Sequence, residues 1–220
     1  MVDIKGAFDR VHRDTLIDTL ESMSLPTAAI SWVHHFLTER CTSLVVDGRV
    51  SHSRPVQTGI PQGSPISPLL FMLYTAPMCK VIKDNGGKCV VYVDDITIYV
   101  QGSVKGNTEK LSKLLAICTK WARDHHTDVD LGDKLGFIHL RAPKQEREKA
   151  HETPLLLPDG GVRTPQEEVK LLGITLDSGL NFRSHIKNMT SRAERTLQQM
   201  CPLPLNSRVA LSFACLQAFV

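Results

Sequence analysis

Residues 88–100 read Lys88-Cys89-Val90-Val91-Tyr92-Val93-Asp94-Asp95-Ile96-Thr97-Ile98-Tyr99-Val100. Two adjacent aspartates stand between two runs that are rich in β-branched residues, and such runs favour strands. Successive side chains of a strand point to opposite faces, so each run can present one apolar face. We therefore predict a β-hairpin with Asp94 and Asp95 at its tip.

The two neighbouring carboxylates repel each other and lack the partners that make acids tolerable in a sheet. A divalent cation would relieve that repulsion, and a site made of oxygen ligands suits Mg²⁺. The alternative is an ordinary turn, because aspartate is a common turn residue. Taken alone, these residues leave both interpretations open.

Composition sets broad limits. The chain has 220 residues, which is room for one domain of ordinary size or for one domain plus a fragment, and 42% of them are hydrophobic, which is enough for a core. A net charge of +3 permits nucleic-acid binding without establishing it. Six cysteines form no Cys-x-x-Cys pair, which indicates reduced thiols of an intracellular protein, in the nucleus or cytoplasm with the mitochondrion left open. No apolar run has membrane-spanning length, so no membrane partner is expected.

Local patterns predict the other elements. Apolar residues at helical spacing predict helices near residues 16–23, 26–37, 69–82, 107–125 and 186–200, and the start of another helix at 206–220. Ser67 can cap the third helix. Strand-like patterns and turn residues predict a hairpin at 43–51, a strand at 135–140, a hairpin at 155–162 and strand structure at 169–177.

A loop rich in Gly and Pro, residues 57–68, leads into the third helix. Asp3, in the first segment of the chain, is far from Asp94 in sequence, but a central antiparallel sheet could bring the two together. Carboxylates from two strands can hold two Mg²⁺ ions about 3.5–4 Å apart, the arrangement used for in-line nucleotidyl transfer.

Three motifs occur together in this chain. They are Asp3-Ile4-Lys5-Gly6-Ala7-Phe8-Asp9, then Gly59-Ile60-Pro61-Gln62-Gly63-Ser64-Pro65-Ile66-Ser67-Pro68-Leu69-Leu70-Phe71, then Tyr92-Val93-Asp94-Asp95. In this order and spacing they closely resemble reverse transcriptases of the non-LTR retrotransposon type, with a fungal-like character. The resemblance extends from residue 1 to about residue 200.

The resemblance implies an α+β fold, the polymerase palm, in which helices pack on one face of an antiparallel sheet. Residues 1–183 would form this palm together with strands that resemble the primer grip. Leu172 and Gly173 resemble the turn of that grip, although a plain core strand is the alternative. Residues 184–220 would begin a helical, thumb-like connection.

The implied activity is RNA-directed DNA polymerisation, in which a primer 3′-OH attacks the α-phosphate of a dNTP. The implied partners are an RNA template, a DNA primer and dNTPs, with two Mg²⁺ ions as cofactor and Mn²⁺ as a possible substitute. The family places its basic fingers before the first motif, so we expect a truncated palm that lacks fingers and thumb segments of a longer polypeptide and is inactive alone. The alternatives are a non-catalytic remnant that at most binds nucleic acid, and a different Mg²⁺-dependent phosphotransferase or nuclease.

The family's catalytic roles transfer to five positions. Asp3 and Asp94 resemble the metal-binding carboxylates, and Ile4 resembles the residue whose main-chain carbonyl contacts a metal. Asp95 resembles the second acid of the hairpin, either as a ligand or in support. Lys134 resembles the lysine that protonates the leaving pyrophosphate, with a solvated lysine as the alternative.

Four further positions resemble substrate-binding residues. Phe8 matches the steric gate against a ribose 2′-OH, or it is a core aromatic. Gln62 and Gly63 match the loop that contacts the incoming nucleotide and the template base, or they form a plain turn. Tyr92 matches the aromatic residue beside the primer end, or it packs within the sheet.

Overall fold

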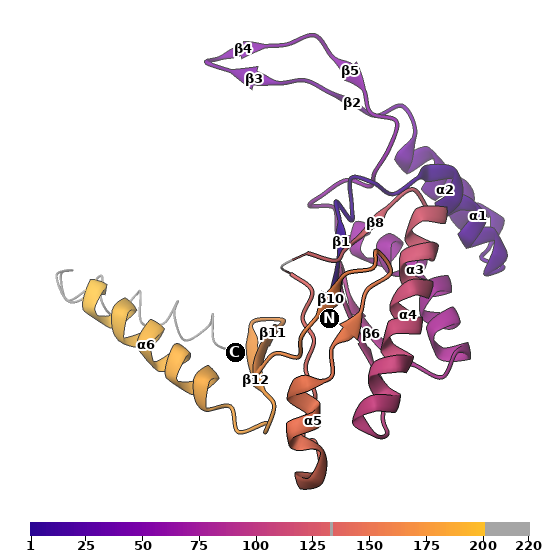
Figure 1. Ribbon diagram of the computed structural model, residues 1–220. Helices are drawn as coiled ribbons and strands as arrows, with labels where there is room; N and C mark the ends of the chain where they lie inside the picture. The colour runs from indigo at the N-terminus through magenta and orange to yellow at the C-terminus, as the bar shows by residue number, and fades with distance from the viewer. Residues whose placement is uncertain (133, 201–220) are drawn as a thin grey trace. The chain divides into compact units, whose positions relative to one another are not determined.

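The computed structural model describes residues 1–132 and 134–200 and has an α+β fold with antiparallel sheets (Figure 1). Within these residues the helices are α1 (Arg13–Ser22), α2 (Thr27–Leu37), α3 (Ser67–Asp84), α4 (Val104–Asp124), α5 (Arg147–Glu152) and α6 (Arg183–Met200), with a 3-10 turn at Lys144–Glu146. The strands are β1 (Val2–Lys5), β2 (Cys41–Thr42), β3 (Val45–Val46), β4 (Arg49–Val50), β5 (Arg54–Pro55), β6 (Lys88–Tyr92), β7 (Asp95–Tyr99), β8 (Asp128–Asp130), β9 (Leu155–Leu156), β10 (Val162–Arg163), β11 (Glu168–Leu171) and β12 (Ile174–Asp177).

The chain divides into two compact units, residues 1–166 and residues from 167 onward. The predicted palm boundary after residue 183 follows the family resemblance, whereas the division after residue 166 follows the contacts within each unit. The boundary after residue 183 stays a prediction. Across the described residues, no helix is both long enough and apolar enough to cross a bilayer.

The first unit is built on a four-stranded antiparallel sheet with the order β6-β7-β1-β8. Val2 and Ile4 of β1 are buried and belong to the hydrophobic core, whereas Asp3 and Lys5 between and after them face the other side. Helix α3 packs on β6, and α4 packs on β8 and on α3. The helices therefore cover one face of the sheet, and the charged residues of β1 lie on the opposite face.

The hairpin with the adjacent aspartates is confirmed. Strand β6 ends at Tyr92, β7 begins at Asp95, and these two residues are paired in register. The two-residue turn between them consists of Val93 and Asp94, with Val93 at φ +55°. Asp94 is thus at the tip, and Asp95 is the first residue of the returning strand.

The five predicted helices of the described region are confirmed, but the cap of α3 was predicted wrongly. Ile66 occupies the N-cap position, and Ser67 is already helical. Its buried hydroxyl instead donates to the main-chain oxygen of Pro61 at 2.5 Å. Helix α4 begins three residues earlier than expected because Ser103 provides a cap for the amide of Gly106.

The predicted strand at residues 135–140 is wrong. This segment makes main-chain bonds at two separate points: Gly136 exchanges hydrogen bonds with Met1, and Phe137 accepts one from the amide of Gln166. Two isolated contacts do not form a ladder. The strand that completes the sheet is β8, which precedes this segment and pairs with β1.

The two short predicted hairpins are confirmed. Strands β3 and β4 are joined by Asp47 and Gly48, both at positive φ, and β9 pairs with β10. In the second unit, β11 pairs with β12, and Leu172 and Gly173 form the turn at φ +47° and +86°. The predicted final helix at 206–220 lies outside the described residues.

Candidate active site

The first and third motifs meet in the centre of the sheet. Asp3 on β1 is the direct antiparallel partner of Asp95 on β7, and the amide of Ile4 donates to the main-chain oxygen of Asp94 at 3.3 Å. Side chains directly opposite each other in an antiparallel pair point to the same face, with their Cβ atoms about 4.5–5.5 Å apart. The pairing register therefore places the carboxyl groups of Asp3 and Asp95 side by side on the face that the helices leave open.

The pKa of Asp95 reflects partial burial and the negative charges of the neighbouring acids. Partial burial raises the pKa of the Asp95 carboxyl, and the neighbouring charges of Asp94 and Asp3 raise it further. The ammonium group of Lys134 acts in the opposite direction and lowers that pKa. Asp3 and Asp95, which are 92 positions apart in the sequence, therefore share one electrostatic environment with Asp94 and Lys134.

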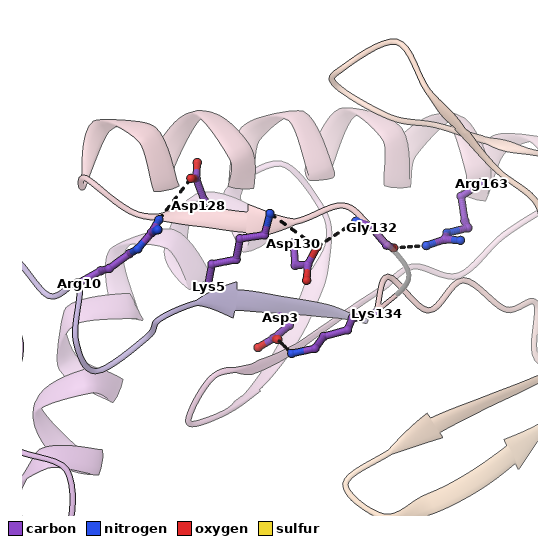
Figure 2. Close-up of polar contacts among 8 residues, drawn as sticks. All are labelled: Asp3, Lys5, Arg10, Asp128, Asp130, Gly132, Lys134 and Arg163. Carbon is purple, nitrogen blue, oxygen red and sulfur yellow. Dashed lines mark hydrogen bonds and ion pairs between the residues drawn. The ribbon is translucent and has the colours of Figure 1, made fainter. Parts of the chain in front are cut away.

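Lys134 forms an ion pair with Asp3, as Figure 2 shows. Its Nζ lies 2.7 Å from Oδ2 of Asp3, and the Asp3 side chain is 18% exposed whereas that of Lys134 is 69% exposed. The hydrogen bond to Asp3 and the charge of Asp3 raise the pKa of the Lys134 ammonium, so the lysine is held in its protonated form. The structure thus brings together Asp3, Asp94, Asp95 and Lys134, four of the residues that the sequence singled out.

Asp130 is a neighbour of this group that the sequence analysis missed. It is the antiparallel partner of Asp3 on β8, and the Nζ atom of Lys5 lies 3.8 Å from its Oδ1 (Figure 2). The alternation Asp128-Val129-Asp130, with only Val129 buried, marks a strand face. Three residues are too few to be recognised as a strand without knowledge of β1.

The loop of the second motif is attached by main-chain bonds to the first motif and to the residues just after it. The amide of Ile60 donates to the oxygen of Phe8, and the amide of Gly59 donates to that of Val11, both at 2.8 Å. Gly59 has φ +76°, and a Cβ there would lie 2.8 Å from the oxygen of Phe8, so only glycine fits. The side chain of Gln62 completes the attachment by donating from Nε2 to Oδ1 of Asp9 at 3.0 Å.

Phe8 and Gly63 differ in their surroundings. The half-buried ring of Phe8 lies 5.6 Å, centroid to centroid, from that of Phe71 in the core. Gly63 is exposed at φ +89°, and a Cβ at this position would meet no atom within 4 Å. Gln62 is likewise exposed, so the predicted nucleotide-contacting turn is open to solvent as far as residues 1–132 and 134–200 are concerned.

The remaining predicted residues are placed as follows. Tyr92 is 63% exposed and is directly opposite Asp95 in the hairpin. Ile4 is buried, and its amide contacts the aspartate turn. Leu172 and Gly173 belong to the second unit, so their predicted contact with a primer stays a prediction.

The donors at this site are compatible with a hard divalent cation. The donors are carboxylate oxygens. The pKa of Asp95 is raised first by desolvation and then by the charges of Asp94 and Asp3, and a cation would relieve this second, repulsive contribution. Across residues 1–132 and 134–200, no three His, Cys, Asp or Glu side chains converge closely enough to enclose a metal ion. Mg²⁺ is commonly held by only one or two carboxylates together with substrate phosphates and water, which matches a pair of acids rather than a closed cage.

Comparisons with known proteins identify the family of this chain. The model of the family described as reverse transcriptase (RNA-dependent DNA polymerase) matches residues 1–176. Among curated proteins, the RNA-directed DNA polymerase from mobile element jockey of Drosophila melanogaster is 26% identical over 220 residues, which cover 97% of this chain and 23% of that protein. The probable RNA-directed DNA polymerase from transposon BS of the same species is 26% identical over 212 residues, or 90% of this chain and 22% of the relative.

A third relative is the retrovirus-related Pol polyprotein from type-1 retrotransposable element R1 of Bradysia coprophila, 24% identical over 188 residues, or 84% of this chain and 18% of that protein. These matches confirm the predicted resemblance to proteins of non-LTR retrotransposons, while the fungal-like character stays a prediction. The chain spans about a fifth of the length of these relatives.

Proposed function

This chain belongs to the reverse transcriptase (RNA-dependent DNA polymerase) family, and we propose that residues 1–183 are the catalytic palm of an RNA-directed DNA polymerase. The observation that carries the proposal is the pairing of Asp3 with Asp95, which joins the first motif to the aspartate turn. The proposed reaction is transfer of a nucleotide from a dNTP to a DNA primer, directed by an RNA template.

We propose that Asp3 and Asp94 hold two Mg²⁺ ions, with Mn²⁺ as a possible substitute and with Asp95 as a further ligand or a support. The main-chain oxygen of Ile4 would be an additional ligand. When bound, such an ion pair would stabilise the attacking and leaving oxygens of an in-line displacement. The repulsion of Asp95 by Asp94 and Asp3, which adds to the effect of desolvation in raising the Asp95 pKa, supports the assignment, because a bound cation would relieve it.

In the proposed reaction, the primer 3′-OH gives its proton to solvent water and forms a bond to the α-phosphorus while the bond from that phosphorus to the pyrophosphate oxygen breaks. Lys134 would donate a proton to the departing pyrophosphate oxygen. Its ammonium group lies at the acids and carries a raised pKa, so the proton is present at neutral pH. The ion pair with Asp3 supports this role, because a solvated lysine would have no fixed position.

The substrate-binding part of the proposal concerns two surfaces. Phe8 would exclude a ribose 2′-OH, and the exposed turn of Gln62 and Gly63 would contact the incoming nucleotide and the template base. The attachment of this turn to the first motif through Asp9 supports the idea that both serve one substrate.

The primer completes the proposed set of contacts. Tyr92, exposed beside Asp95, would lie against the primer end. Leu172 and Gly173 would contact the primer as the turn of a grip. We also propose an intracellular location, in the nucleus or cytoplasm with the mitochondrion as the alternative, which the free thiols of Cys79, Cys89 and Cys118 support.

Primer extension tests this function. The 220-residue chain and a longer polypeptide that contains it should be assayed on a primed RNA homopolymer with Mg²⁺, Mn²⁺ or EDTA. Templated, metal-dependent synthesis by the longer polypeptide is expected, and the 220-residue chain alone should be inactive. A remnant would bind primed template without extending it under every condition, and a nuclease would nick plasmid DNA instead.

A further inference from the structure

We propose that Arg163 and Asp130 are positioning residues for Lys134. They bind the two main-chain groups of Gly132, one from each side, and so fix the turn that carries the lysine to Asp3. This inference rests on the proposed function for the role of Lys134, but the positioning itself can be tested without any catalytic assay.

The contacts on Gly132 are the first observation, and Figure 2 shows them together. The amide of Gly132 donates to Oδ1 of Asp130 at 3.0 Å. The oxygen of Gly132 accepts a hydrogen bond from Nη2 of Arg163. Both peptide groups that flank this residue are therefore held by charged side chains, and hydrogen bonds with one ionised partner are stronger than neutral ones.

The same oxygen has a second partner next to the lysine. The amide of Leu135, the residue after Lys134, donates to the oxygen of Gly132 at 3.0 Å. Leu135 is buried in the core. Arg163 supplies the other donor to that oxygen, and a carbonyl oxygen has two lone pairs with which to accept both.

Lys134 needs such support. Its side chain is largely exposed, and an exposed lysine that pairs with a carboxylate gains little from the pair because ordering its long side chain costs entropy. A backbone that is already fixed beside Asp3 reduces that cost, which is the general benefit of preorganisation. Without it, the ammonium group would spend more of its time away from the acids.

Asp130 and Arg163 are themselves held by the scaffold. Asp130 is the register partner of Asp3 and also pairs with Lys5, so two strands determine its position. Arg163 lies on β10, whose partner strand β9 packs on α4. The amide of Leu156 on β9 donates a hydrogen bond to the hydroxyl oxygen of Ser112 on α4 at 3.2 Å. The role that we assign to the β9–β10 hairpin is therefore to position the guanidinium group of Arg163 at the oxygen of Gly132.

The direct test measures how quickly an amine-acylating reagent modifies Lys134 in the 220-residue chain, read by mass spectrometry in metal-free buffer. Arg163→Met keeps the aliphatic stem but removes every donor, and it should accelerate acylation of Lys134 roughly two- to fivefold, the range expected when a weak exposed ion pair is lost. Asp3→Asn removes the partner itself and sets the upper limit. Arg163→Lys retains a donor and should return the rate most of the way to that of the unchanged chain.

Controls separate positioning from general loosening. Arg123→Met removes an exposed arginine of α4 and should leave the acylation rate of Lys134 unchanged. Asp130→Asn keeps an oxygen acceptor and should act weakly, whereas Asp130→Ala should act like Arg163→Met. The double variant Arg163→Met/Asp130→Ala should exceed neither single variant by much, because both act on one turn. Melting temperatures of all variants verify that the fold persists.

An unchanged acylation rate in both Arg163→Met and Asp130→Ala would overturn the proposal, whatever the chain does in catalysis. In a polypeptide active in primer extension, Arg163→Met should lower kcat two- to fivefold and leave KM for dNTP unchanged. The fold-decrease in kcat should match the fold-increase in the acylation rate of Lys134. Faster acylation combined with an unchanged kcat would support the positioning contact and contradict the catalytic role of Lys134. The two failures are therefore distinguishable.

Discussion

Asp3 and Asp95 are direct partners in the antiparallel pairing of β1 with β7, and this register puts two carboxylates on the open face of the sheet next to Asp94. A shift by one residue would turn one of the two side chains to the helix-covered face. The core residues Val2 and Ile4 prevent that shift, because they would then have to leave the hydrophobic interior. The hydrophobic core thus maintains the juxtaposition of the acids.

Asp94→Asn should abolish templated primer extension while leaving the fold intact. An amide cannot replace the charge that the proposed metal ions require, so we expect a loss in kcat of about 10³-fold, comparable to the loss of another strong electrostatic contact in an active site. Asp128→Asn is the matched control, since Asp128 lies on the same sheet face and pairs with Arg10 at 3.3 Å. Activity retained in Asp94→Asn would contradict the assignment.

Phe8→Val should increase incorporation of ribonucleotides relative to deoxyribonucleotides. A smaller side chain removes the ring that would collide with a 2′-OH, and the ratio of kcat/KM for the two substrates measures the change. Loss of the contact with Phe71 should lower the melting temperature by roughly 2–4 °C, the equivalent of about 1 kcal/mol. Phe36→Val on α2 controls for loss of a half-buried ring, and an unchanged ratio in Phe8→Val would mean that Phe8 only packs.

Gly63→Val should greatly reduce primer extension and should lower the melting temperature only as far as backbone strain at φ +89° requires. A Cβ at this position meets no atom of the described residues within 4 Å, so a loss of activity beyond the effect of strain would come from a clash with substrate. Gly48→Val isolates the strain, because Gly48 has φ +73°, is equally open, and lies in the β3–β4 turn. Equal losses of activity in both variants would show that the substrate does not approach Gly63.

Asp95→Asn should stabilise the metal-free protein at neutral pH. The pKa of Asp95 is raised in the folded state. The group therefore contributes favourably to the free energy of unfolding at pH values below its unfolded-state pKa, near 3.9. This contribution is lost as the pH rises through the folded-state pKa. Replacing the carboxylate should therefore raise the melting temperature in EDTA by about 1–3 °C at pH 7, and by nothing near pH 3. Asp18→Asn on the exposed face of α1 should show no such pH dependence, and a lower melting temperature for Asp95→Asn would mean that the site does not repel.

Much of this arrangement could be anticipated from local sequence. The alternation around Asp94 and Asp95, the Asp47–Gly48 turn and the spacing of apolar residues in α1, α2 and α4 each depend on neighbours within a few positions. The errors came where a local preference lost to a distant partner. Ser67 donates to Pro61 instead of capping its helix, and residues 135–140 bond to Met1 and Gln166 at separate points instead of forming a strand.

The sequence by itself determined that two motifs carry acids and that one of these motifs is a hairpin turn. Only the tertiary structure decided that Asp3 faces Asp95 and Asp130, that Gln62 reaches Asp9, and that Arg163 holds the turn of Lys134. Lys134 and Asp3 are 131 positions apart, and nothing in the pattern near either residue specifies the other. Their contact follows from the register of β1 between β7 and β8, which is set by burying Val2, Ile4, Ile96 and Val129 in one shared core.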